Sequence, residues 1–334
     1  MPHAPPLGAL LRQYAAGSPL DCAPVDQGLL NRGYRLRTTR GRYFLKHHFD
    51  PDTADEASIV RQHRATQRLA DLGVPVAPPL PGRDGRTVAV VGGHAYALHP
   101  WIDGRHRHGA QLTPGECARL GALLGVVHAS LDRVMPAHPR ARAARPESVA
   151  PADTFAVIDD LLARVRRHRP ADTFDELARH RLLERRALLE RNADRRPRRG
   201  GPAGWVHGDF HPFNLLYRDD APAAIVDWDR LGVQPRAEEA VRAAAIFFVL
   251  PGGTLDLPKA RAYARAYRRA AGATPSELAA AVHRVWWERL NDFWMLRWHY
   301  ERGDTRADSQ FPAASALAVW WTREYDAVCD AFTL

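Results

Sequence analysis

The alternation of apolar and polar residues predicts a strand-rich first part of the chain. Residues 42–46 (Arg-Tyr-Phe-Leu-Lys) alternate as a half-buried strand does, and two further strands are indicated at 87–91 and 94–98. After the first strand, residues 54–72 have the length and spacing of a helix, which Gly73 ends. We therefore expect a β-sheet and one long helix in the first hundred residues.

The periodicity then changes to that of helices. Residues 113–116 (Thr-Pro-Gly-Glu) form a capping box with proline at the first helical position, and Leu120 and Leu124 belong to the apolar stripe that follows. We find no internal repeat. The change in pattern predicts an α+β protein with two lobes, a β-rich lobe of residues 1–100 and a mainly helical lobe of residues 101–334.

Length and composition allow a large buried core. The chain has 334 residues, of which 46% are hydrophobic, so one or two domains are expected. The formal net charge of +9 could indicate a nucleic-acid partner. However, the excess arginine is concentrated in residues 164–199, in a helical stretch mixed with glutamate, which is typical of solvated helix faces. The sequence has neither zinc-finger spacing nor an aromatic RNA-binding strand pair, so we expect no nucleic-acid partner.

The cysteines and the apolar runs bear on the location of the protein. Cys22, Cys117 and Cys329 are far apart and form no paired pattern, which is typical of a reducing compartment. Residues 1–6 lack the charged and apolar regions of a signal peptide. No apolar run approaches the roughly 20 residues that span a bilayer. We expect a cytoplasmic protein without a membrane partner.

Two short segments carry the densest chemistry of the chain. Residues 207–214 (His-Gly-Asp-Phe-His-Pro-Phe-Asn) place an acid five residues before a carboxamide, and residues 225–229 (Ile-Val-Asp-Trp-Asp) add two acids. Phosphoryl transfer from a nucleotide needs such a set, with one carboxylate for the attacking hydroxyl and an amide oxygen plus another carboxylate for magnesium. A metal-dependent hydrolase also uses closely spaced His and Asp ligands and is an alternative interpretation of the first segment.

A predicted β-hairpin connects these two segments. The apolar runs at 215–217 and 224–226 flank the turn residues 219–222. Asn214 precedes the first strand and Asp227 follows the second. Because a hairpin brings its two ends together, both side chains can reach one cation.

Lysine usage gives an independent indication. The chain has 47 Lys and Arg residues, but only Lys46 and Lys259 are lysines. Lys46 ends a predicted strand, where a compact ammonium can bridge the α- and β-phosphates of a nucleotide better than a planar guanidinium can. The alternative is a surface lysine at a strand end. The neighbouring His47 and His48 have no metal-ligand spacing, and we expect them to be exposed.

The pattern His-Gly-Asp, four residues, Asn, and then Ile-x-Asp-aromatic resembles the aminoglycoside phosphotransferase family, which also contains choline, homoserine and sugar kinases. The resemblance implies a bilobal protein-kinase-like α+β fold with a small β-rich N-terminal lobe and a large, mainly helical C-terminal lobe. It implies Asp209 as the catalytic base and Asn214 and Asp227 as ligands of Mg²⁺. The phosphoryl donor would be ATP or GTP.

The same resemblance indicates nucleotide contacts in the first lobe. A strand-turn-strand over residues 26–36 would cover the phosphates, which makes Asn31 and Arg32 candidate contacts. The adenine would bind to backbone groups near Leu98 and His99.

One position departs from the family pattern. Kinase folds pair the strand lysine with a glutamate on the next helix, and Gln62 stands where this glutamate is expected. Glu56 could replace it only in a different helical register. A glutamine can hydrogen-bond to Lys46 but adds no counter-charge, so a nucleotide sensor without catalysis is a further alternative.

The acceptor side is indicated more weakly. The family builds its acceptor pocket from the last helices, and this region contains six of the nine tryptophans. Four residues recur at helical spacing and would share one helix face: Trp287, Asn291, Trp294 and Trp298. This face is either a core stripe or part of the pocket. The candidate acceptor contacts are Asp229, Glu288, Asp292 and Trp298.

Together these observations predict a kinase that phosphorylates a hydroxyl group of a small molecule. An aminoglycoside-like or other antibiotic is the first expectation for the acceptor, as in resistance enzymes of the family. A metabolite such as a sugar, a choline-like alcohol or homoserine is the alternative. The positive net charge of the chain does not favour a cationic antibiotic.

Overall fold

The computed structural model describes residues 5–25, 31–49, 55–137, 147–197 and 203–334. These residues form two compact units, and each unit is built from several stretches of the chain. The first unit contains the described residues of 1–107, 126–137 and 205–232. The second unit contains the described residues of 108–125, 138–204 and 233–334.

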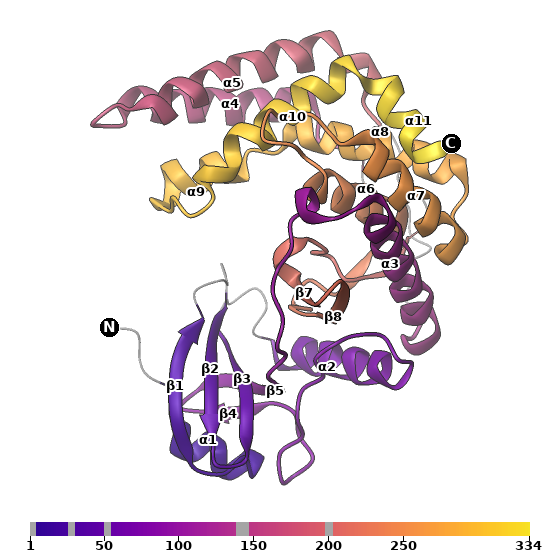
Figure 1. Cartoon of the computed structure of the whole chain (residues 1–334). Helices are drawn as coiled ribbons and strands as arrows, with labels where there is room; N and C mark the ends of the chain where they lie inside the picture. The colour runs from indigo at the N-terminus through magenta and orange to yellow at the C-terminus, as the bar shows by residue number, and fades with distance from the viewer. Residues whose placement is uncertain (1–4, 26–30, 50–54, 138–146, 198–202) are drawn as a thin grey trace. The chain divides into compact units, whose positions relative to one another are not determined.

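A five-stranded antiparallel sheet is the centre of the first unit, and its strand order is β1-β2-β3-β5-β4 (Figure 1). The strands are β1 (Pro19–Val25), β2 (Arg32–Thr38), β3 (Gly41–His48), β4 (Ala89–Val91) and β5 (His94–Pro100). The three strands predicted from alternation correspond to β3, β4 and β5. In the register of the sheet, Lys46 of β3 lies opposite Gly33 of β2 and Ala97 of β5.

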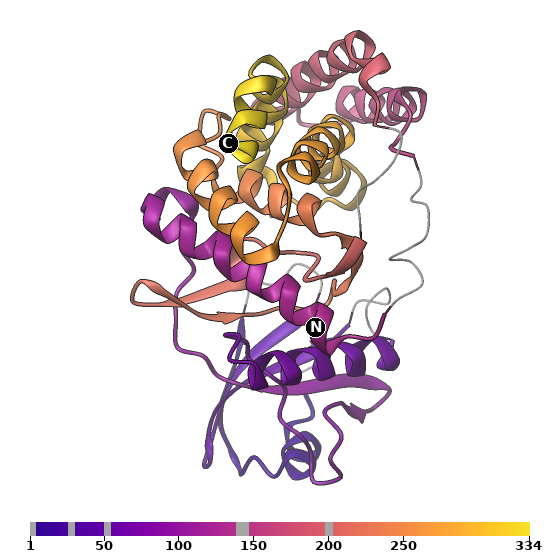
Figure 2. The same cartoon turned by 90° about the vertical axis from the view of Figure 1, so that its right-hand side faces the viewer.

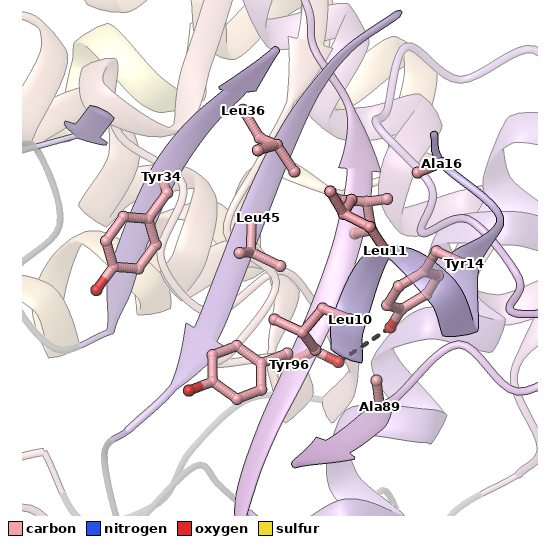
Figure 3. Close-up of a cluster of buried hydrophobic side chains, with 10 residues drawn as sticks. Leu10, Leu11, Tyr14, Ala16, Tyr34, Leu36, Leu45, Ala89 and Tyr96 are labelled. Atoms are coloured by element: carbon pink, nitrogen blue, oxygen red, sulfur yellow. Dashed lines mark hydrogen bonds between the residues drawn. The ribbon is translucent and has the colours of Figure 1, made fainter. Parts of the chain in front are cut away.

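The short helix α1 (Leu7–Tyr14) packs against this sheet (Figure 3). The helix and the strands together bury Leu10, Leu11, Tyr14, Leu36, Leu45, Tyr96 and Leu98. Burial of one leucine side chain stabilises a fold by about 1.5–3 kcal/mol, so this cluster is a main source of stability for the unit. The hydroxyl of Tyr14 donates hydrogen bonds to the carbonyl oxygens of Thr87 (2.9 Å) and Tyr96 (3.1 Å), which satisfies its polar end.

The long helix expected after the lysine strand is α2 (Glu56–Asp71). The carboxylate of Asp55 caps its first turn by accepting a hydrogen bond from the Ser58 amide at 2.9 Å. The helix buries Ile59 and Leu69, as an amphipathic helix should, but it also buries Gln62 and His63. Buried polar residues need partners: Gln62 donates to the backbone carbonyl oxygen of Asp229 at 3.2 Å, and Nδ1 of His63 lies 2.7 Å from the hydroxyl of Thr87.

The predicted hairpin is confirmed as β7 (Leu215–Arg218) and β8 (Ala221–Ile225). Leu215 pairs with Ile225 at its open end. The amide of Val226 then donates to the carbonyl oxygen of Asn214 at 2.9 Å. The two segments with the densest chemistry are therefore joined directly, next to Asn214 and Asp227.

Helices make up most of the second unit (Figure 2). They are α4 (Pro151–Arg167), α5 (Thr173–Arg191), α6 (Arg236–Phe247), α7 (Leu257–Ala271), α8 (Pro275–Asn291), α9 (Trp294–Arg302), α10 (Phe311–Arg323) and α11 (Tyr325–Thr333). The helix α3 (Pro114–Val134) is divided between the units, and the short strands are β6 (Ala203–Val206) and β9 (Gly232–Pro235). Of the helices that the structure describes, none combines the length and the apolar character that crossing a membrane requires.

The N-terminal half of α3 begins with the predicted capping box and packs closely on α7. The carboxylate of Glu116 accepts from the Thr113 amide at 2.7 Å. A β-carbon at Gly121 would lie 2.1 Å from the carbonyl oxygen of Tyr263, and one at Gly125 would lie 2.6 Å from the β-carbon of Ala270. Only glycine allows the two helices to approach this closely.

The predicted single helix face near residue 290 is wrong. The helix α8 ends at Asn291 and α9 begins at Trp294, and the Asp292 carboxylate accepts from the Trp294 amide (3.2 Å) at this break. Aspartate readily bonds to nearby backbone amides, which favours the end of one helix and the start of another. Trp287 is a core residue, 1% exposed, whereas Trp294 and Trp298 are partly exposed.

Candidate active site

His207 fixes the loop that carries the catalytic candidates. It is fully buried, its Nε2 lies 3.0 Å from the carbonyl oxygen of Val226, and its Nδ1 accepts from the Asp209 amide at 3.2 Å. Since a carbonyl oxygen only accepts, the ring proton is on Nε2. Gly208 has a φ of 87°, and a β-carbon there would lie 2.1 Å from the carbonyl oxygen of Arg230. Both residues therefore shape the loop.

Asp209 and Asn214 are held together at the two ends of this loop. The side-chain amide of Asn214 donates to the carbonyl oxygen of Asp209 at 2.8 Å and lies 3.4 Å from its carboxylate. This orientation leaves Oδ1 of Asn214 as the oxygen that can bind a cation. Burial opposes ionisation of Asp209, but the nearby His211 (3.4 Å) and Arg230 (3.9 Å) leave its pKa below the ordinary value. Asp209 is therefore a carboxylate at neutral pH and can accept a hydrogen bond.

Lys46 lies between two carboxylates that follow β8. Its Nζ is 2.8 Å from Oδ1 of Asp227 and 2.6 Å from Oδ1 of Asp229. Burial opposes the charge on Lys46, but the two carboxylates raise its pKa above the ordinary value. Asp229 is the more buried acid, with 8% of its side chain exposed against 44% for Asp227, and burial raises its pKa. The group is a compact charge cluster with one cation and two acids.

The backbone of Asp227 adopts a left-handed conformation with φ of 58°. Such a conformation costs free energy in a residue other than glycine and is frequent at functional sites. Lys46 contacts only Oδ1 of the Asp227 carboxylate, and the side chain of Asp229 also interacts with this carboxylate.

The structure shows which residues support Lys46. Gln62 donates to the backbone carbonyl oxygen of Asp229 at 3.2 Å, and among the described residues neither Gln62 nor Glu56 contacts the Lys46 ammonium. Asn31 donates to the Asp229 carboxylate and accepts from the Phe49 amide at 2.8 Å. The sequence pattern placed Asp229 with the acceptor contacts, but the structure brings it to Lys46 and Asn31.

The remaining nucleotide candidates lie on the same sheet. The carbonyl oxygen of Leu98 accepts from the Leu80 amide at 2.7 Å, so this backbone group already has one partner. The ring of His99 hydrogen-bonds to the carbonyl oxygen of Ala77 at 2.9 Å. Arg32 lies over the ring of Phe49, with 4.5 Å between the guanidinium carbon and the ring centroid.

The expectation that His47 and His48 are exposed is wrong, because the two residues are 5% and 3% exposed. They belong to the central strand β3, where both faces of the sheet are covered. His47 stacks on Tyr96 at 4.5 Å, and His48 lies 6.2 Å from the ring of His63 on α2. Burial lowers the pKa of His48 to about 2 and that of His63 to about 3. These rings are therefore neutral at pH 7 and add no positive charge around Lys46.

The acceptor candidates of the second unit have partners of their own. Both carboxylate oxygens of Glu288 accept from Arg242, at 2.8 and 2.7 Å. Asp292 lies 4.0 Å from Nη1 of Arg289, and burial raises its pKa. The ring of Trp298 is 5.2 Å from that of Trp294. The carboxylates that were expected to face a cationic acceptor are thus partly or fully neutralised within the chain.

Comparisons with known proteins bear on the family and the fold of this chain. A family model described as the phosphotransferase enzyme family matches residues 21–273. Among curated proteins, the homoserine kinase of Burkholderia multivorans is 27% identical over 318 residues, which cover 87% of this chain and 86% of the relative. The homoserine kinase of Acidiphilium cryptum is 24% identical over 323 residues, which cover 89% of this chain and 94% of the relative.

Solved structures with the same fold include two enzymes that act on antibiotics. A spectinomycin phosphotransferase in complex with ADP and spectinomycin has a TM-score of 0.65 at 14% identity, over 100% of both chains. An amicoumacin kinase in complex with AMP-PNP and Ca²⁺ has a TM-score of 0.58 at 17% identity, over 96% of this chain and 92% of the other. At these identities the similarity establishes the fold, and it confirms the predicted α+β, protein-kinase-like fold.

Proposed function

Because this chain belongs to the phosphotransferase enzyme family, we propose that it transfers the γ-phosphoryl group of ATP or GTP to a hydroxyl group of a small molecule. The observation that carries the proposal is the set formed by Asp209, Asn214, Asp227 and Lys46 within one compact unit. The division into a nucleotide lobe of residues 1–100 and a catalytic and acceptor lobe of residues 101–334 is part of the proposal. So is the cytoplasmic location.

Asp209 is proposed as the catalytic base. Its low pKa keeps it ionised at neutral pH, so it can accept a hydrogen bond from the acceptor hydroxyl and orient that oxygen for attack. The hydrogen bond from Asn214 to the Asp209 carbonyl holds the loop while this happens. In this role the carboxylate positions the nucleophile and takes its proton.

Asn214 and Asp227 fit a magnesium ion. Asn214 offers Oδ1, because its amide nitrogen is turned to Asp209, and Asp227 offers the carboxylate oxygen that Lys46 does not contact. When bound, the ion would offset the negative charge of the phosphates. The strained backbone of Asp227 supports a functional role for this residue rather than a structural one.

Lys46 is proposed to hold the α- and β-phosphates, with Asp229 as its counter-charge. An ammonium has three N–H donors, so Lys46 can keep Asp229 and still donate to phosphate. Asp229 would then replace the helix glutamate of other kinases, whose place is taken by Gln62. The intact pair of charges favours a catalytic enzyme over a nucleotide sensor.

A hydroxy amino acid of the homoserine type is the acceptor that we propose first. The homoserine kinases match over most of their length, and Glu288 is already neutralised by Arg242, which reduces the attraction for a cationic antibiotic. An aminoglycoside-like or other antibiotic acceptor is the second candidate, supported by the fold shared with the spectinomycin and amicoumacin enzymes.

An acceptor screen tests the proposal. Consumption of ATP and of GTP with Mg²⁺ would be followed in the presence of L-homoserine, choline, 1-amino-2-propanol and spectinomycin. We expect nucleotide consumption that depends on one acceptor, and phosphorylation of that acceptor's hydroxyl seen by mass spectrometry.

The rival metal-dependent hydrolase makes a different prediction. Both ring nitrogens of His207 are engaged by backbone groups, which leaves this residue unsuited as a metal ligand. A kinase should be stabilised thermally by Mg²⁺ with a nucleotide. Stabilisation by a transition metal alone, with no effect of any nucleotide, would favour the hydrolase.

A further inference from the structure

Arg185 of α5 is a buried guanidinium group that has no carboxylate within ion-pair distance in the described part of the chain. The residue is 5% exposed. It donates to the carbonyl oxygens of Arg289 and Ser315, and its Nε has no acceptor. The ring of Phe293 lies 5.4 Å from the guanidinium carbon. Burial lowers the pKa of Arg185 to about 10, which still leaves the group charged at neutral pH. A buried charge without a counter-ion is costly, so its retention needs an explanation.

Two more arginines surround this group. Arg181 pairs with Glu184 at 2.6 Å, and Arg289 lies 4.0 Å from Asp292. The Nε atoms of Arg181 and Arg289 are also buried without an acceptor among the described residues. Three guanidinium groups therefore face two carboxylates, and the raised pKa of Asp292 weakens one of these. The neighbourhood has an excess of about one positive charge.

A small cavity opens at these arginines. It has about 40 Å³ of space for water-sized molecules, which is room for about three waters. Its wall is formed by α5, α8, α10 and the start of α9, and the apolar part of the wall includes Leu182, Phe293, Trp294, Leu296 and Phe311. A cavity of this size admits a group of about three heavy atoms, such as a carboxylate.

We propose that this cavity binds the carboxylate group of a small molecule, with Arg185 as the buried counter-ion and Arg181 and Arg289 beside it. A singly charged carboxylate matches the excess of one positive charge, and its two oxygens suit the fork of guanidinium donors. A doubly charged phosphate would add a negative charge next to Asp292. The binding does not depend on the proposed function.

Direct titration of the full-length protein tests the binding. L-Homoserine and acetate carry the carboxylate, and L-homoserinol carries an alcohol in its place. Calorimetry and the fluorescence of Trp294, which lines the cavity, report occupancy without nucleotide. We expect both carboxylates to bind the parent protein and L-homoserinol to bind at least about tenfold more weakly.

Two variants separate binding from structure. Arg185→Met keeps the volume of the side chain and removes the charge, and we expect it to weaken both carboxylates by at least about tenfold. Arg186→Met is the matched control, because Arg186 is the next residue of α5 and pairs with Asp159 at 2.6 Å instead. The control should bind as the parent does. If Arg185→Met does not fold, Arg181→Gln gives the same readout at a more exposed position.

If L-homoserine binds the parent protein but is not phosphorylated, the cavity is an effector site for carboxylates. The proposal fails if neither carboxylate binds the parent protein, or if Arg185→Met and its substitute bind them as tightly as the parent. Stabilisation by magnesium and ATP, measured in parallel, shows whether the kinase assignment itself has failed.

Discussion

Lys46, with 12% of its side chain exposed, and the buried Arg185 are both largely shielded from solvent, but they differ in their counter-charges. Lys46 has two carboxylates within 2.8 Å, both supplied by the segment after β8. Arg185 has two backbone carbonyl oxygens, an aromatic face and an adjoining cavity. The first cation is balanced by its own protein, whereas the second is balanced only when an anion is bound. The Lys46 site therefore has its counter-charges before any ligand binds, whereas the Arg185 site obtains its counter-charge from the proposed ligand.

The largest effect should come from removing the proposed catalytic base, Asp209, which belongs to the same unit as Lys46. Asp209→Asn keeps the shape of the side chain but removes the base, so turnover should fall by a factor on the order of 10² or more. Nucleotide consumption measures turnover, and circular dichroism checks folding. Asp219→Asn is the control, because Asp219 is exposed and its left-handed backbone (φ 52°) suits asparagine. Near-normal turnover in a folded Asp209→Asn protein would remove Asp209 from the mechanism.

The next test removes one carboxylate from Lys46. Asp229→Asn should raise the KM for ATP by about tenfold, because Lys46 then has only Asp227, which is also needed for the metal ion. Gln62 contacts the backbone of Asp229. Adding Gln62→Glu to this variant restores a counter-charge near Lys46 and should recover part of the loss.

If Asp229 has only a structural role, a different result is expected. Asp229→Asn would then lower the melting temperature without a selective effect on the KM for ATP, and Gln62→Glu would restore nothing. Steady-state kinetics at varied ATP, together with thermal melting, distinguish the two roles.

A third test uses pH on the unit that contains Lys46. The pKa of His48 is about 2 in the folded protein, against an ordinary value of 6.5, so the unfolded chain binds more protons between these values. Stability should therefore fall as pH drops below about 6.5, by about 2 kcal/mol at pH 5 for this residue.

Amide hydrogen exchange in β3, compared at pH 7 and pH 5, measures this loss locally. His48→Phe should reduce the dependence on pH, because the group that must become charged is gone. His180→Phe on the exposed face of α5 is the control and should keep the parent's dependence. An unchanged dependence in His48→Phe would show that other groups cause it.

The smallest effect should come from giving Arg185 a carboxylate partner of its own, as Lys46 already has. Ala314→Asp adds a carboxylate to the lining of the cavity, where it can pair with Arg185. Affinity for acetate should fall by about threefold to tenfold, because the internal acid competes with the ligand. Ala313→Asp on the same helix, outside the lining, is the matched control for calorimetry. Equal losses in the two variants would show that the competition is not local.

Local patterns predicted the elements of the candidate site well. The lysine strand, the helix that follows it and the hairpin at 215–225 are all present, because alternation, caps and turns depend on residues close in sequence. The placement of Asn214 beside the end of β8 followed from the hairpin alone. The family-level function could therefore be inferred from short stretches of the sequence.

The partners of Lys46 could not be predicted in the same way. Lys46 and Asp229 are 183 positions apart, and Asn31 and Asp229 are 198 positions apart. No local sequence pattern links residues so far apart. The second acid of Asp-Trp-Asp, Asp229, was the one feature that indicated a further carboxylate near the site. The burial of His47 and His48 depends on the position of β3 in the centre of the sheet, which strand alternation does not specify. Arg185 was missed because it lies in an arginine-rich helix that looks solvated throughout.

Because the chain has only two lysines, Lys46 can be labelled covalently with little competition from other amines. Its ammonium is held by two carboxylates, so ordinary amine reagents should leave it intact. An ATP analogue with an acyl-phosphate would instead deliver the reactive carbon to this nitrogen. Only one other lysine exists, Lys259, whose ammonium donates to the carbonyl oxygen of Gly109 at 2.9 Å. The mass of a single tagged peptide would then report nucleotide occupancy, even in a crude extract.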